Sequence, residues 1–78
     1  MNWRDHIISD KAILAGKPII KNSRLSVELV LDLLAGGWTE KMIMESYPYL
    51  TEQDMKAVFA FLREGVENEL YLPLPKSA

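Results

Sequence analysis

The sequence contains no cysteine and a single histidine, His6. Without thiols the chain can form neither a disulfide nor a thiolate metal site, and a zinc site on one histidine would need several carboxylates. We therefore expect no metal and no cofactor. The absence of cysteine also fits a reducing compartment, so we expect a cytoplasmic protein.

Long apolar runs are also missing. No stretch approaches the roughly 20 residues that a helix needs to cross a bilayer, and Met1–His6 does not resemble a secretory signal. We expect no membrane partner. A chain of 78 residues forms one domain with a small core. Because no disulfide or metal can add stability, we expect a homodimer, and the β-branched run at Ile19–Ile20 suggests a free strand edge for it.

Basic residues are scarce where nucleic-acid binding would need them most. The net charge is −2. Residues 1–25 hold five basic and two acidic side chains (+3), whereas residues 26–78 hold four basic and nine acidic ones (−5). The second part lacks the positive field that drives most nucleic-acid binding. Any contact with DNA must therefore involve the basic first part.

The distribution of basic, apolar and proline residues divides the chain into three segments. Residues 1–25 form a basic arm, whose short β-branched pieces predict one or two strands. Residues 26–69 form a core of three helices with helix-turn-helix spacing. Residues 70–78 form an extended apolar tail, because Pro73 and Pro75 exclude a helix there. The predicted fold is mainly α: a three-helix bundle preceded by short strands.

The helix boundaries are well marked. Hydroxyl side chains suited to N-capping precede each predicted helix, at Ser26, Thr39 and Thr51. Asp54 follows the third cap by three residues and completes a capping box. Gly36–Gly37 ends the first helix through a left-handed residue. Pro48 ends the second helix at Tyr47.

The apolar pattern of the third helix predicts which of its faces is buried. The buried face is expected to contain Met55, Val58, Phe59, Leu62 and Val66. The outer face is expected to contain Gln53, Lys56, Ala57, Ala60, Glu64 and Glu67. Phe61 lies apart from the buried stripe. It is a scattered surface aromatic, an aromatic covered by the tail, or an anchor for a binding partner.

The helix-turn-helix spacing between Thr39 and Leu62 allows two interpretations, since a plain three-helix bundle gives much the same pattern. If DNA binds, Lys17, Lys21 and Arg24 of the arm would contact phosphates, and Gln53 and Lys56 would reach base edges. The carboxylates of the third helix would repel phosphates. The structural alternatives are that Arg24 pairs locally with a carboxylate and that Lys17 and Lys21 are solvated.

Partner binding is the other predicted role. The candidate contact residues are Phe61, Leu70, Tyr71, Leu72 and Leu74. The tail residues could strap a partner or fold back over Phe61 and Trp38. His6, Asp5 and Asp10 resemble a proton-transfer set, but no nucleophile or oxyanion device accompanies them. We therefore expect neither an enzyme nor a small-molecule substrate.

Two motifs resemble a known family. The Gly-Lys-Pro-Ile-Ile run that starts at Gly16 and the Tyr-Pro-Tyr-Leu-Thr run that starts at Tyr47 are similar to the domain-of-unknown-function family numbered 433, over residues 6–67. The resemblance implies a homeodomain-like fold preceded by short strands and a prokaryotic source. It also implies an antitoxin of a VapBC-type system, paired with a PIN-like ribonuclease toxin. The family's Gly-Thr-Arg turn reads Asn22-Ser23-Arg24 here, and Asn22 can adopt the same left-handed conformation.

Two hypotheses of function follow. The first is a small antitoxin-like protein that binds a PIN-like ribonuclease toxin and, as a second partner, its own operator DNA. The alternative is a protein-interaction or dimerisation module that does not bind DNA. The acidic third helix favours the alternative.

Overall fold

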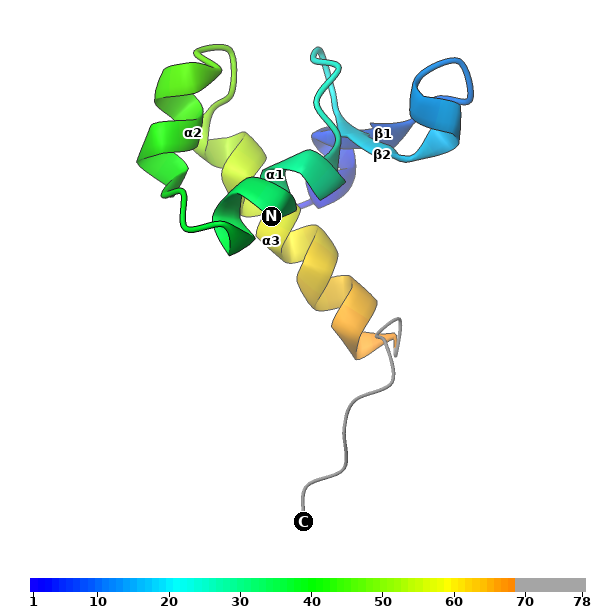
Figure 1. Cartoon of the computed structure of the whole chain (residues 1–78). Helices are drawn as coiled ribbons and strands as arrows, with labels where there is room; N and C mark the ends of the chain where they lie inside the picture. Colours follow the sequence, from blue (N-terminus) through cyan, green and yellow to red (C-terminus); the bar gives the residue numbers. More distant parts are fainter. Residues whose placement is uncertain (69–78) are drawn as a thin grey trace.

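A computed structural model gives the fold, and it describes residues 1–68. The elements in chain order are the 3₁₀ helix η1 (Trp3–Asp5), β1 (Ile7–Ser9), the 3₁₀ helix η2 (Leu14–Gly16), β2 (Pro18–Ile20), α1 (Val27–Ala35), α2 (Glu40–Ser46) and α3 (Glu52–Glu67). Three α-helices and one antiparallel pair of strands confirm a mainly α protein (Figure 1).

The helices begin where the capping residues predicted. The side chains of Ser26, Thr39 and Thr51 each accept a hydrogen bond from a backbone N–H in the first turn that follows. At α3 the carboxylate of Asp54 also accepts from the N–H of Thr51, which confirms the capping box. Each cap satisfies backbone donors that the helix leaves open, and is worth about 1 kcal/mol.

The helix ends also follow the sequence. Gly36 caps the end of α1, and Gly37 takes a φ of +98°, a conformation that glycine adopts without strain. α2 ends at Ser46, and Tyr47 leaves the α-helical region with φ −127° and ψ 78°, as expected for the residue before Pro48. Only five residues then separate α2 from α3. The joint between the two helices is therefore short.

The sheet differs from the prediction at one edge. β1 and β2 pair antiparallel, with Ile7 opposite Ile20. Asn22, at φ +65°, turns the chain back so that the N–H of Ile20 donates to the C=O of Leu25, and Ile19 forms a bridge with Ser26. Ile19 and Ile20 are 1% and 0% exposed. The expected free edge at Ile19–Ile20 is wrong, because the segment after the turn covers it.

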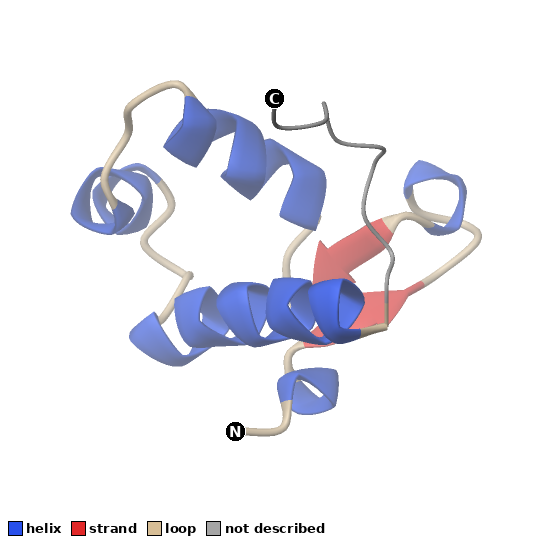
Figure 2. Cartoon of the chain, turned by 90° about the horizontal axis from the view of Figure 1, so that it is seen from below, coloured by secondary structure: helices blue, strands red, loops and turns tan. Residues whose placement is uncertain are grey.

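The core joins the first strands to all three helices. Its buried members are Ile7, Ile20, Val27, Val30, Ile43, Leu50, Met55, Ala57 and Val58. Figure 2 shows α3 passing across one side of the hairpin while α1 and α2 lie on the other sides of the bundle. The basic first segment therefore packs into the domain. None of the helices in residues 1–68 is long and apolar enough to cross a membrane.

α3 is rotated relative to the prediction. Phe59 is 44% exposed and Val66 is 62% exposed, whereas Ala57 is fully buried and Phe61 packs against the core. The buried face is centred on Val58 and Phe61, a rotation of roughly 75° at 100° per residue. The cause is the N-terminal segment: η1 and β1 contact α3 along a flank that the helix sequence alone cannot identify. The assignment of Phe59 and Val66 to the buried face is therefore wrong, as is the placement of Ala57 and Phe61 outside it.

Candidate partner and nucleic-acid surfaces

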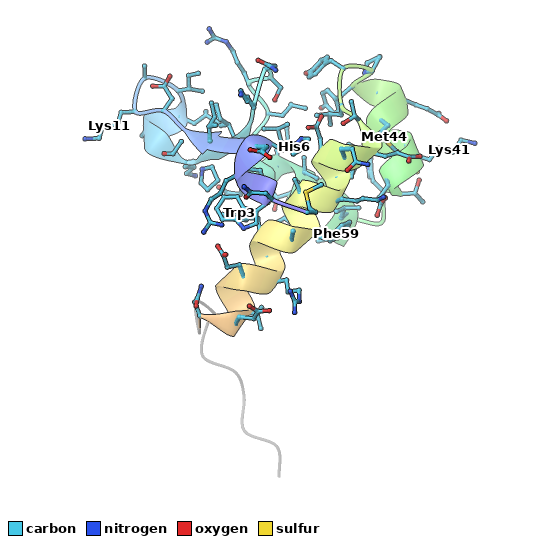
Figure 3. The ribbon with its side chains drawn as sticks, turned by 180° about the vertical axis from the view of Figure 1, so that it is seen from behind. Trp3, His6, Lys11, Lys41, Met44 and Phe59 are labelled. Atoms are coloured by element: carbon cyan, nitrogen blue, oxygen red, sulfur yellow. The ribbon has the colours of Figure 1, made fainter. Side chains whose placement is uncertain are left out.

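Phe61 lies where three parts of the chain meet. Its ring contacts the indole of Trp3 edge-on, with centroids 5.0 Å apart and planes at 84°. Such T-shaped pairs place the positive edge of one ring against the negative face of the other. Figure 3 shows Trp3 on η1, alongside the middle of α3. Phe61 is therefore held in place by a residue 58 positions earlier, and no local pattern in the sequence indicates this pair.

Two mainly apolar hollows lie on either side of Phe61. The first has a volume of about 420 Å³ and is lined by Trp3, Arg4, Phe61, Leu62, Glu64, Gly65, Val66 and Asn68. The second has about 390 Å³ and is lined by Lys17, Pro18, Val27, Glu28, Leu31, Asp32 and Phe61. Because Phe61 belongs to both walls, the hollows are adjacent, and we call the two together the Phe61 groove. It runs from the end of α3 to the middle of α1.

Ion pairs border the Phe61 groove. Arg4 stacks over the Trp3 ring at 4.3 Å and lies 2.9 Å from the carboxylate of Glu64. At the other end, the Lys17 ammonium donates to Glu28 at 2.9 Å. This hydrogen bond, together with the charge of Glu28, raises the pKa of Lys17 above its ordinary value. Both pairs are largely exposed, so their main effect is to set the charge of the rim.

Trp3 carries a second unusual feature. Its indole Nε1 is buried, and no hydrogen-bond acceptor reaches it within residues 1–68. Buried donors nearly always have a partner, because an unmade hydrogen bond costs the desolvation of the group. The described part of the chain therefore leaves the buried indole donor of Trp3, a residue that also lines the Phe61 groove, without an acceptor.

A polar hollow of about 310 Å³ forms a second candidate surface. It is lined by Asp5, His6, Lys21, Asn22, Tyr49, Thr51 and Asp54. These residues come from the arm and from the joint before α3, the two segments that carry the family motifs. The structure brings them together, although the two segments are far apart in the sequence. Lys21 thus lies beside the start of α3.

His6 closes this hollow. Its Nδ1 lies 2.9 Å from Oδ1 of Asp54, whose other oxygen accepts from the N–H of Thr51. A carboxylate only accepts, so Nδ1 carries the proton. His6 pairs with neither Asp5 nor Asp10, and it follows η1 rather than lying in a strand. Its contact ties the arm to the first turn of α3.

The predicted DNA contacts are only partly available. Lys21, Arg24, Gln53 and Lys56 are exposed, whereas Lys17 is paired with Glu28. Within residues 1–68 no carboxylate forms an ion pair with Arg24, so the expected local pairing is absent there. α3 carries four carboxylates against two basic side chains, which opposes phosphate binding. The predicted partner residues Leu70, Tyr71, Leu72 and Leu74 lie outside the described residues.

Comparison with known proteins identifies a family but no individual relative. No curated protein and no solved structure matches the chain. The model of one family, described as a protein of unknown function (DUF433), matches residues 7–62. That range includes both strands, α1, α2 and most of α3, with the polar hollow's His6 just outside it. The match covers more than two thirds of the sequence, and the chain therefore belongs to the DUF433 family.

Proposed function

We propose that this chain is a small antitoxin-like protein that binds a PIN-like ribonuclease toxin in the cytoplasm. The observation that carries the proposal is the Phe61 groove, with about 420 and 390 Å³ on its two sides. Binding sites are typically concave, mainly apolar and a few hundred Å³ in volume, and both hollows fit this description. The nature of the partner follows from the resemblance of the family motifs to VapBC-type antitoxins. Phe61 and residues 70–74 supply the apolar contacts.

The test is binding to the product of the neighbouring gene. We would purify both proteins and measure the affinity by calorimetry, together with inhibition of the partner's ribonuclease activity. Val66→Lys places a charge in the groove and should weaken binding at least tenfold. Phe59→Lys is the matched control, because it adds the same charge to an exposed apolar position of α3 that lines neither hollow. Equal affinities for the two variants, or no binding by the wild type, would reject the proposal.

Operator DNA is the second candidate partner. It is favoured by the position of Lys21, which shares the polar hollow with the start of α3. In a homeodomain-like arrangement α2 and α3 form the helix-turn-helix, and Gln53 and Lys56 face outward from the first turns of α3. The basic arm would then contact phosphates beside the groove that α3 enters.

An electrophoretic shift with the upstream DNA, with and without the toxin, tests this part. Replacing Lys21 and Arg24 by alanine should weaken binding to all sequences and reduce the salt dependence by about 0.9 for each phosphate that is no longer neutralised. Replacing Gln53 and Lys56 should alter the preference among sequences more than the affinity. If no DNA shifts under either condition, the chain is a protein-interaction module without DNA binding.

The proposed assembly includes a second copy of the chain. The small core and the exposed apolar side chains of Trp38 and Met42 support self-association. Analytical ultracentrifugation at micromolar concentration should show a species of twice 8.9 kDa. A single 8.9 kDa species would remove the homodimer from the proposal.

A further inference from the structure

The Phe61 groove begins at the point where the described chain ends. Asn68, the last described residue, lines the first hollow. The groove then passes Phe61 and ends at Leu31 and Asp32 of α1. In Figure 1 the last turns of α3 project beyond the other helices and the hairpin. The residue that follows Asn68 therefore starts beside an open apolar surface.

The sequence of residues 69–78 matches this surface. Leucines stand at positions 70, 72 and 74, alternating with Tyr71 and Pro73. In an extended chain alternate side chains point to the same side, so the three leucines share one face. The two prolines exclude a helix and favour the extended form. The segment can thus present a continuous apolar edge to a groove.

Length and charge agree with the same arrangement. Ten extended residues reach about 33 Å, and the distance along α3 from Asn68 back to Phe61 is about 10 Å, so the segment is long enough to pass Phe61 and reach α1. Lys76 is its only basic residue. Asp32, at the far end of the groove, has no ion pair within residues 1–68. A segment laid in this direction brings Lys76 towards that carboxylate.

We propose that residues 69–78 of the same chain dock in the Phe61 groove, with Leu70, Leu72 and Leu74 facing Phe61. This inference does not require that the partner be a toxin.

The first experiment uses the fluorescence of Trp3. Trp3 and Trp38 are the two tryptophans, so Trp38→Phe leaves Trp3 as the only emitter. In the full-length chain, Leu72→Asp should release the segment and shift the emission to longer wavelength. Tyr71→Asp is the matched control, because its side chain points away from the leucine face, and its spectrum should stay that of the parent. Equal spectra for all three proteins would overturn the proposal, as would equal shifts in both variants.

The second experiment identifies the occupant. Because the chain has no cysteine, an introduced pair supplies the only thiols. Leu31→Cys combined with Leu74→Cys should cross-link within one chain when a short bifunctional thiol reagent is added. Phe59→Cys combined with Leu74→Cys should not. Cross-linked dimers from the first pair would assign the groove to the segment of a second copy and overturn docking within one chain, as would the absence of any cross-link. Neither measurement involves the toxin, so failure here is distinct from failure of the proposed function.

Discussion

The orientation of α3 predicts that Phe61, and not Phe59, holds the domain together. Phe61→Ala removes a half-buried ring that packs on Trp3 and on the core. Truncating a fully buried phenylalanine costs about 3–5 kcal/mol, and an aromatic pair adds about 0.5–1.5 kcal/mol beyond its buried area. Because part of Phe61 lines the groove, we expect a destabilisation at the lower end, about 3 kcal/mol.

Such a destabilisation is large for a domain of this size. At about 4–8 °C per kcal/mol for small domains, Phe61→Ala should lower the melting temperature by roughly 12–24 °C. Phe59 is 44% exposed, so Phe59→Ala should cost about 1 kcal/mol. Circular dichroism during thermal and urea unfolding measures both changes. Phe61→Leu keeps most of the volume and should lie close to the wild type.

The ranking of the two variants is the decisive result. If Phe59→Ala is the more damaging one, α3 has the orientation that its apolar pattern alone suggests, and the Trp3–Phe61 contact does not stabilise the fold. The double variant Trp3→Ala with Phe61→Ala provides a further check. The two rings touch, so the double variant should be less destabilised than the sum of the two single variants.

Three further predictions concern the turns and the arm. Asp54→Ala removes both the acceptor for the N–H of Thr51 and the partner of His6, and it should lower the free energy of unfolding in urea by about 1–2 kcal/mol. Asp54→Asn should cost less, because its amide oxygen can still accept a hydrogen bond. Ala15 has φ 55° and ψ 33°, so Ala15→Gly should stabilise the hairpin turn by about 0.5 kcal/mol, while Ala60→Gly inside α3 should cost about 1 kcal/mol. The pKa of Lys17 is raised, so its pair with Glu28 stabilises the folded state at pH values below the ordinary lysine pKa, and this stabilisation is lost as the pH rises through the raised pKa. The stabilities of the wild type and Lys17→Met should therefore converge in strongly alkaline solution. A difference in stability that stays unchanged there would contradict the pairing.

The features that the sequence predicted are those set by neighbouring residues. The caps at Ser26, Thr39 and Thr51 depend on a hydroxyl and a backbone N–H within one turn. The stops at Gly37 and Tyr47 depend on one left-handed glycine and on one proline. Interactions of this kind lie within about one helical turn, and their chemistry is independent of the rest of the fold. The boundaries could therefore be predicted directly.

The features that the sequence missed join distant parts of the chain. α3 contains apolar residues on two overlapping stripes, one through Phe59 and one through Phe61, and Val58 and Leu62 fit either. The choice between them depends on which flank is covered by η1 and β1, and no periodicity within α3 contains that information. The same holds for the edge at Ile19–Ile20, which is covered by residues that follow the Asn22 turn.

The location of the candidate surfaces follows from these long-range contacts. The first hollow needs Trp3 and Arg4 against the far half of α3, and the Arg4–Glu64 pair spans 60 positions. The polar hollow needs His6 against Asp54, 48 positions away. Both surfaces therefore depend on the docking of the first six residues, although composition marks those residues only as part of a basic arm.

Arm and helices consequently act as one unit. A partner that binds the Phe61 groove contacts the same N-terminal segment that positions Lys21 beside α3. Binding at one surface can alter the other by moving this segment. The contacts of Trp3 with Phe61 and of His6 with Asp54 resist such movement, because each would have to break before the segment could shift.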